Sequence, residues 1–153
     1  MSDTPQIIHT VEQRTAFIHI IIPRDEIQNV MGPGIGELMS ALAAQGIAPT
    51  GQWFTHHRRR PTDTFDFEIS VPVSAPIAAS GRVQPGMWPA MKVARTFHRG
   101  PYEGLAEAWG NFMDWIESNG HTRADDLYER YIVGPDASPD PTSWCTELNQ
   151  PLK

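Results

Sequence analysis

The feature that most constrains the fold is a helical pattern of apolar residues that occurs twice, 74 residues apart, in the 153-residue chain. In the second half it runs from Tyr102 to Ile116, with apolar side chains at every third or fourth position. The shift of 74 aligns Ile35 with Trp109, Leu38 with Phe112, Met39 with Met113, Leu42 with Ile116 and Gly46 with Gly120. The repeat predicts two units of similar build, each with one amphipathic helix that stops at a glycine.

Segments typical of strands surround both predicted helices in the same order. Residues 15–22, 51–58 and 65–73 are the predicted strands of the first half, and residues 89–97, 127–133 and 143–148 those of the second. Because the exposed sheet edge of one such unit needs a partner, pairing of two units is physically sensible. We therefore predict an α+β fold of two pseudo-twofold-related strand-helix-strand-strand modules with a central ligand cleft.

The glycine- and proline-rich segments are interpreted as punctuation between these elements. Gly32, Gly34 and Gly36 do not have the spacing of a dinucleotide fingerprint, so we expect a flexible start of the first helix. Pro85 and Gly86 are expected to continue a turn-rich connection between the halves. The length fits a single domain over residues 1–153, with internal halves of about 10–75 and 88–152.

Charge and cysteine content narrow the classes of partner and compartment. The formal net charge is -6, which disfavours nucleic acid as a direct partner. Cys145 is the single cysteine, so we expect no intramolecular disulfide and a cytoplasmic protein. No apolar run is long enough to cross a bilayer, so no membrane partner is expected. The six histidines show no metal-binding spacing, and we expect neither a metal nor another cofactor.

Two glutamates on predicted strands of the second half are candidate site residues. If residues 127–133 form one strand, Glu129 shares a face with Tyr131 and with apolar neighbours. A carboxylate there has to be paired, hydrogen-bonded or functional, and Arg130 points to the other face. Glu147 is the second candidate, on the last strand. In the alternative interpretation one face of each strand is solvated, and both acids are ordinary surface residues.

Aromatic residues gather in the same half of the chain. Tyr102 follows Gly100 and Pro101 at the start of the second helix, where a tyrosine can present its hydroxyl to a cleft while its ring packs. Aromatic walls with one or two acids suit a flat, apolar ligand, a cation included, through stacking, cation–π attraction and charge pairing. The candidate ligand-binding residues are therefore Tyr102, Trp109, Glu129, Tyr131, Glu147 and Trp88.

Four motifs of the second half occur in an order typical of one protein family. They are His98-Arg-Gly-Pro-Tyr-Glu-Gly-Leu105, Trp115-Ile-Glu-Ser-Asn-Gly120, Tyr128-Glu-Arg-Tyr-Ile-Val-Gly-Pro135 and Thr146-Glu-Leu-Asn-Gln-Pro151. With them the chain resembles the GyrI-like effector-binding superfamily. This superfamily includes gyrase-inhibitor-like proteins and the ligand-sensing domains of AraC-type and MerR-type multidrug activators.

The resemblance implies two modules around a cleft that binds diverse lipophilic, often cationic, small molecules. In the family, the acid of the Glu-x-Tyr strand and the acid of the closing Thr-Glu strand are associated with the pocket, and these match Glu129 and Glu147. Tyr102 matches the tyrosine of the Gly-Pro-Tyr motif, and Tyr131 matches the strand tyrosine. Unlike the activators, the chain has no room for their DNA-binding domain, so no direct DNA binding is expected.

Three functions follow from the residues and the resemblance. The first is a binding module that captures or senses a lipophilic, aromatic compound, with Glu129 as the counter-charge of a cation. The second is a hydrolase that opens the cyclopropane of DNA-alkylating compounds, because some members of the superfamily resemble such hydrolases. Glu129 and Glu147 would be its catalytic residues, and Tyr102 or Tyr131 would donate a hydrogen bond to the developing oxyanion. The third is a protein-binding, gyrase-inhibitor-like role.

Overall fold

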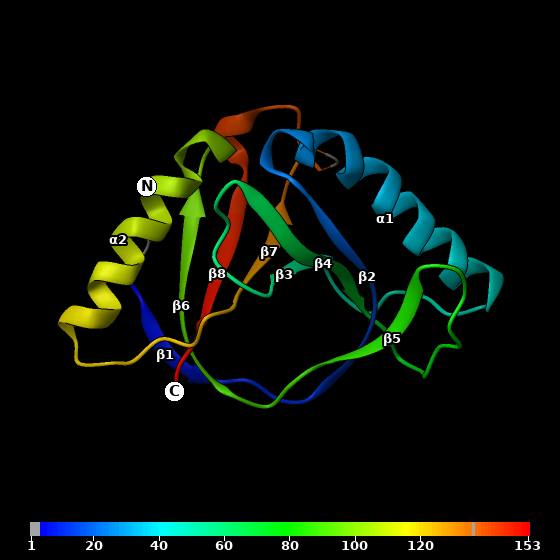
Figure 1. Ribbon diagram of the computed structural model, residues 1–153, viewed down its shortest axis with the longest axis horizontal. Helices are drawn as coiled ribbons and strands as arrows, with labels where there is room; N and C mark the ends of the chain where they lie inside the picture. Colours follow the sequence, from blue (N-terminus) through cyan, green and yellow to red (C-terminus); the bar gives the residue numbers. More distant parts are fainter. Residues whose placement is uncertain (1–3, 136) are drawn as a thin grey trace. The chain divides into compact units, whose positions relative to one another are not determined.

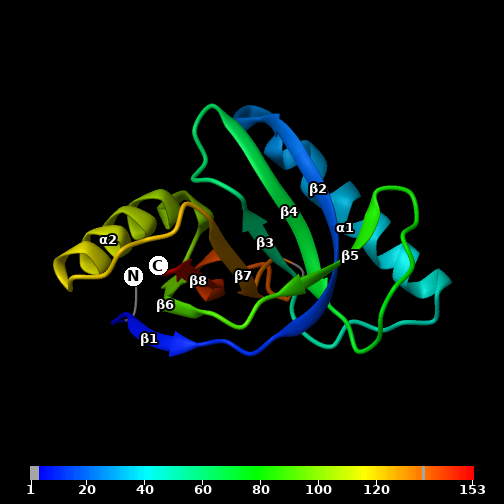
Figure 2. The ribbon, with the colours of Figure 1, turned by 60° about the horizontal axis from the view of Figure 1, so that its bottom comes forward.

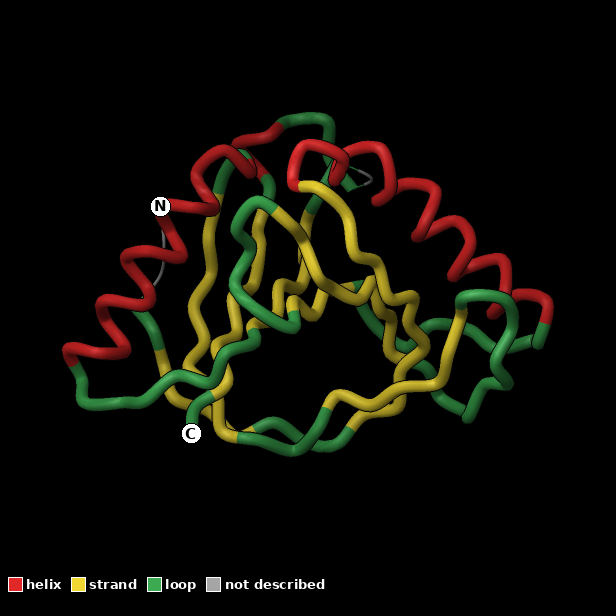
Figure 3. Tube along the Cα trace, in the orientation of Figure 1, coloured by secondary structure: helices red, strands yellow, loops and turns green. Residues whose placement is uncertain are grey.

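The computed structural model describes residues 4–135 and 137–153. The chain divides into two compact units, Met1–Thr10 with Met91–Lys153 (unit 1) and Val11–Ala90 (unit 2). Within the described residues each unit has one long helix and four strands. Figure 1 labels these elements, and Figure 3 colours the helices red and the strands yellow. The predicted α+β class is therefore confirmed. The pseudo-twofold relation, the central ligand cleft and the single-domain organisation stay predictions.

Unit 2 is an antiparallel sheet with α1 packed on one face. Its strands are β2 (Gln13–Pro23), β3 (Phe54–His57), β4 (Thr64–Pro72) and β5 (Val83–Trp88), in the order β3-β4-β2-β5, and α1 spans Ile27–Ala44. The core between helix and sheet consists mainly of fully buried aliphatic side chains and one aromatic ring: Leu38, Leu42, Ile18, Phe67, Ile69 and Val71. The alternation predicted for residues 65–73 therefore holds, with Phe67, Ile69 and Val71 on the α1 face.

The glycine segment lies inside α1, so the prediction of a flexible helix start was wrong. The helix begins at Ile27 and therefore includes all three glycines, Gly32, Gly34 and Gly36, as well as Pro33. A Cβ atom on Gly34 would lie 2.6 Å from Cδ1 of Ile69, so the missing side chain lets the helix approach the sheet closely. Packing on the apolar sheet therefore outweighs the low helix propensity of glycine and proline.

Pro85 and Gly86 lie in β5, so their prediction as part of a turn-rich connection was also wrong. β5 pairs with β2 and is the last strand in the sheet order, with Pro85 opposite Ala16. A proline lacks the N–H group that a central strand needs, but it is tolerated on an edge strand. A Cβ on Gly86 would lie 2.7 Å from the ring of Phe17, which favours glycine at this position.

Unit 1 also consists of antiparallel strands, with α2 packed on one face. Its strands are β1 (Gln6–His9), β6 (Lys92–Arg99), β8 (Cys145–Pro151) and β7 (Leu127–Val133), in the order β1-β6-β8-β7. Figure 2 shows the unpredicted strand β1 beside β6. A 3-10 turn at Tyr102–Gly104 leads into α2 (Leu105–Ser118). The helix buries Trp109, Phe112, Met113 and Ile116 of the predicted stripe, together with Ala108, which the stripe did not include.

Both long helices end where the sequence predicts, at a glycine. Gly46 and Gly120 have φ angles of 69° and 78°, in the left-handed region that glycine adopts without strain. In each case the glycine N–H bonds a carbonyl three residues back, and the following N–H bonds one five residues back. This is the Schellman arrangement, which satisfies carbonyls that a helix end leaves free.

Among residues 4–135 and 137–153, no helix combines the length and the apolar character that crossing a bilayer requires. The cytoplasmic location expected from the sequence stays a prediction.

Glu68 is expected to make unit 2 sensitive to acid. Its carboxylate lies 3.3 Å from Nδ1 of His56 and accepts two hydrogen bonds from Arg58, at 3.1 and 2.9 Å. Burial raises the pKa of Glu68, but the hydrogen bonds and charges of His56 and Arg58 outweigh burial and hold the pKa below its usual 4.5. The stabilisation is therefore present above pH 4.5 and is lost as the pH falls through the folded-state pKa.

The measurement is urea denaturation at about pH 6 and about pH 3. The free energy of unfolding should fall less between these values in Glu68→Gln than in the wild type, because glutamine has no proton to take up. Asp63→Asn, at an exposed position of the same unit, is the control and should behave as the wild type does. An equal fall in Glu68→Gln and in the wild type would contradict the assignment.

Candidate functional site

The pairing of β7 with β8 decides where the two predicted acids point. Glu129 lies opposite Leu148, and Arg130 lies opposite Glu147. Leu148 belongs to the core beneath α2, so Glu129 points to the α2 side of the sheet. Glu147 is the next residue before Leu148 and points to the other side. The structure therefore does not bring the two carboxylates together.

Glu129 is held by two aromatic donors. The indole Nε1 of Trp109 donates to Oε2 of Glu129 at 2.6 Å, and the hydroxyl of Tyr131 donates to Oε1 at 2.8 Å. Trp109 comes from α2 and is only 6% exposed, whereas Tyr131 is two residues along β7 on the same face. Both oxygens of this carboxylate are thus fixed by side chains of neutral residues.

Further aromatic rings extend this group. The ring of Tyr102 lies 6.1 Å from that of Tyr131 in an edge-on arrangement and 4.8 Å from that of Trp144. Trp144 is anchored because its Nε1 donates to the carbonyl of Ser138 at 2.9 Å. We call the group of Glu129, Trp109, Tyr131, Tyr102 and Trp144 the Glu129 cluster. Four of the six predicted ligand-binding residues are in it.

His98 positions the turn that carries Tyr102. Its Nε2 donates to the carbonyl of Pro101 at 2.9 Å, and since a carbonyl only accepts, Nε2 carries the proton. A Cβ atom on Gly104 would lie 2.8 Å from the His98 ring, so this site favours glycine. The residue-level interpretation did not single out His98 or assign Trp144 a role. His98 belongs to the motif His98–Leu105, whose members Pro101 and Gly104 it contacts, and this motif was the sequence feature that could have identified His98.

Glu147 lies in a different environment, surrounded by cationic and amide groups. Its side chain is 6% exposed, and its Oε1 accepts a hydrogen bond from Nδ2 of Asn149 at 2.9 Å. The same oxygen lies 3.4 Å from Nε of Arg95 and 3.7 Å from Nε of Arg130. We call Glu147, Asn149, Arg95 and Arg130 the arginine cluster. These arginines were missed as partners of Glu147 because the registers of β6 and β7 with β8 are not visible in the sequence.

Trp88, the remaining predicted ligand-binding residue, belongs to unit 2. It ends β5 and is 3% exposed. Its ring packs edge-on against that of Phe54, with the centroids 4.8 Å apart. The structure thus places Trp88 in an aromatic pair of its own unit.

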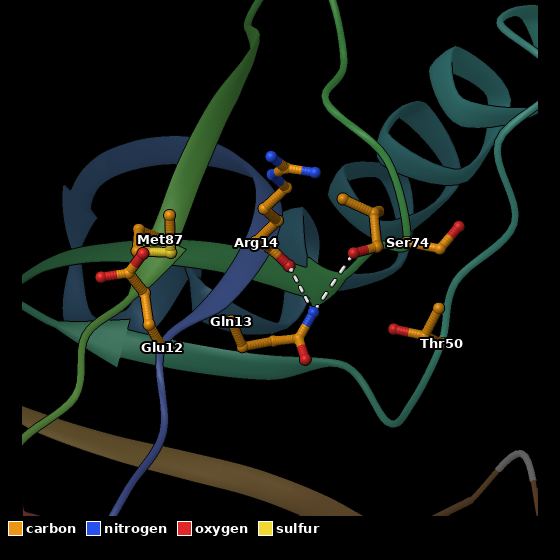
Figure 4. A pocket seen from close by; sticks show the side chains of 7 residues that line it. Glu12, Gln13, Arg14, Thr50, Ser74 and Met87 are labelled. Atoms are coloured by element: carbon orange, nitrogen blue, oxygen red, sulfur yellow. Dashed lines mark hydrogen bonds between the residues drawn. The ribbon is translucent and has the colours of Figure 1, made fainter.

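Unit 2 also has an open cavity of about 500 Å³, shown in Figure 4. Gln13 crosses it, with Nε2 donating to the carbonyls of Arg14 and Val73 at 3.1 and 3.2 Å. The lining is mostly polar, and no predicted site residue contributes to it: Glu12, Gln13, Arg14, Thr50, Val73, Ser74 and Met87.

Within the part of the chain that the structure describes, no group of three or more His, Cys, Asp or Glu side chains could hold a metal ion. The expected absence of a metal or other cofactor stays a prediction.

Several solved structures share this fold. The crystal structure of the EcmrR C-terminal domain matches with a TM-score of 0.88 and 24% identity, over 98% of this chain and 97% of that one. A cryo-EM structure of an EcmrR–DNA complex matches with a TM-score of 0.87 and 24% identity; 98% of this chain is covered, and it spans only 57% of that one.

More distant structures have the same fold at lower identity. A hydrolase from Listeria innocua matches with a TM-score of 0.69 and 12% identity, over 97% of this chain and 91% of that one. SAV2435 bound to tetraphenylphosphonium matches with a TM-score of 0.66 and 13% identity, over 99% of this chain and 94% of that one. At these identities the matches establish the fold alone.

The family assignment rests on sequence. No curated protein matches the chain. The family model of the GyrI-like small molecule binding domain, however, matches residues 3–153, which includes all four motifs and both predicted acids. This chain is therefore a member of the GyrI-like small-molecule binding domain family.

Proposed function

We propose that the chain is a small-molecule binding module that captures or senses lipophilic compounds, cations among them, at the Glu129 cluster. The observation that carries the proposal is the carboxylate set among aromatic rings, with Trp109 and Tyr131 donating to its two oxygens. Both donors are neutral side chains, and they orient the carboxylate. An oriented negative charge beside aromatic rings attracts a cation that carries apolar groups.

The aromatic rings supply the apolar part of the proposed recognition. Tyr102 lies between Tyr131 and Trp144, at 6.1 and 4.8 Å from their rings, and all three are only partly buried. Rings that keep some exposed surface can stack on an aromatic ligand, and their faces favour a cation. The family model and the tetraphenylphosphonium complex of SAV2435, which has the same fold, support a ligand of this class.

The Glu129 cluster does not include every feature that the sequence predicts for the site. The central cleft, and the ligand contacts predicted for Glu147 and Trp88, stay predictions on which the Glu129 cluster does not depend. The DNA contact of the EcmrR complex belongs to that longer protein. For this chain we keep the expectation of no direct DNA binding.

A hydrolase is the second candidate, favoured by one contact. The hydroxyl of Tyr131 and the carboxylate of Glu129 are 2.8 Å apart, close enough for a proton to pass between these two groups, as a general acid or base pair requires. Glu147 lies on the other side of the sheet, so Glu129 would have to act as acid or base without it. The geometry therefore supports binding better than two-carboxylate hydrolysis.

Removing the charge of Glu129 should weaken cations selectively. We expect Glu129→Gln to raise the Kd of tetraphenylphosphonium roughly tenfold, the cost of losing about 1.4 kcal/mol of charge pairing. The neutral triphenylphosphine oxide should change by less than about twofold, because its stacking on the rings does not involve the charge. Both are measured by quenching of the tryptophan fluorescence.

The matched control is Glu117→Gln, which removes an exposed carboxylate of the same unit that pairs with Arg123. It should bind both compounds as the wild type does. An equal loss of the cation and of the neutral compound in Glu129→Gln would contradict the role of the charge.

The hydrolase candidate is separated by product mass. Incubation with a cyclopropane-containing alkylating compound should leave its mass unchanged if the module only binds. Catalytic formation of a water adduct, abolished in Glu129→Gln and retained in Glu117→Gln, would instead establish the hydrolase.

A further inference from the structure

The face of the unit 1 sheet that points away from α2 is cationic. Among the residues of β1, β6, β7 and β8 on this face there are three arginines, Arg95, Arg99 and Arg130, and a single acid, Glu147. The surplus is unexpected in a chain with a formal net charge of -6. A concentration of positive charge on one face therefore needs a reason other than overall composition.

The guanidinium groups of the arginine cluster approach Glu147 through one edge. The nearest contacts of Arg95 and Arg130 to the carboxylate use their Nε atoms, at 3.4 and 3.7 Å. Nε of Arg95 also donates to Oδ1 of Asn149 at 2.6 Å. Carboxylate and sulfonate groups bind guanidinium in a forked manner through two N–H groups, whereas the contact of Glu147 to Arg95 uses Nε.

The electrostatics of Arg95 point in the same direction. Burial lowers its pKa, the neighbouring Glu147 raises it and the positive charge of Arg130 lowers it again, with a net decrease. Both guanidinium groups thus lie near the same carboxylate oxygen, Oε1 of Glu147, which also accepts a hydrogen bond from Asn149. An additional anion would reduce the repulsion between the two arginines.

Aromatic side chains accompany the arginines on this face. Phe97 lies opposite Glu147, and Tyr128 lies opposite Asn149. The guanidinium carbon of Arg99 is 6.0 Å from the centre of the Phe97 ring. Tyr128 is buried, so Phe97, which is partly exposed, is the ring that this face offers beside its positive charges, and it suits an aromatic ligand with an acidic group.

We propose that the arginine cluster is a second binding site, which takes the carboxylate or sulfonate group of an aromatic organic anion. Arg95 and Arg130 supply the charge, and Phe97 the neighbouring ring. Glu147 and Asn149 hold Arg95 in position, but the charge of Glu147 also opposes the ligand. The site lies on the opposite side of the sheet from the Glu129 cluster and selects the opposite charge, so neither proposal depends on the other.

The direction in which Glu147→Gln changes the affinity for an anion distinguishes this proposal from a cation site. The probe is naphthalene-2-sulfonate, with the neutral naphthalene-2-sulfonamide as its matched compound, and binding is measured by titration calorimetry. We expect the sulfonate to bind the wild type at least about tenfold more tightly than the sulfonamide, and Arg95→Gln to remove that preference. Glu147→Gln should strengthen sulfonate binding, because it removes the opposing charge.

The control variant is Arg123→Gln, since the Arg123 side chain is 31% exposed, as is that of Arg130, and lies outside the cluster. It should bind both probes as the wild type does, and so should Glu129→Gln. Weaker sulfonate binding in Glu147→Gln, or equal binding of the two probes by the wild type, would overturn the proposal.

A measurement on the unmodified chain guards against variants that do not fold. In a 15N spectrum the Nε–H signals of Arg95 and Arg130 should move on addition of the sulfonate, whereas that of Arg123 should stay. Movement of all three signals together, or of none, would also overturn the proposal.

Discussion

The antiparallel register of β7 and β8 is the constraint on which both candidate sites depend. It sets Glu129 opposite Leu148, and therefore in the layer between the sheet and α2, while Arg130 and Glu147 meet on the other face. A shift of one residue would exchange the two faces, because side chains alternate along a strand. The burial of Leu148, which is 0% exposed, fixes the register and with it the surroundings of each acid.

The two units place an acid and a base at matching positions of their sheets. The shift of 74 that aligns the helices also aligns His56 with Arg130, and a shift of 79 aligns Glu68 with Glu147. In each unit these two residues face each other across neighbouring strands, at 3.3 Å for His56 and Glu68 and at 3.7 Å for Arg130 and Glu147. The sequence repeat is therefore accompanied by a repeated cross-strand contact between an acidic and a basic side chain, on the face of each unit's strands that points away from its own helix.

The periodic features could be predicted from the sequence, whereas features set by long-range packing could not. The stripe of α2 and the alternation of β4 repeat over enough residues to identify the buried face. Gly34 and Pro85 misled the prediction because the contact with Ile69 and the edge position of β5 override local propensity. For the site, the shared face of Glu129 and Tyr131 was predictable from alternation. The contact of Trp109 with Glu129 could not be predicted, because it depends on how α2 packs on the sheet. The contacts of Arg95 and Arg130 with Glu147 could not be predicted either, because they depend on the strand pairing.

The most direct test of the central claim, that the Glu129 cluster binds the ligand, is a titration of 15N-tryptophan-labelled protein with tetraphenylphosphonium. The indole N–H of Trp109 reports on its 2.6 Å hydrogen bond to Glu129, and it is one of five tryptophan signals. The account predicts a saturable shift of the Trp109 signal, together with that of Trp144, whose ring packs against Tyr102. Saturation by the ligand with the Trp109 signal unmoved would contradict it.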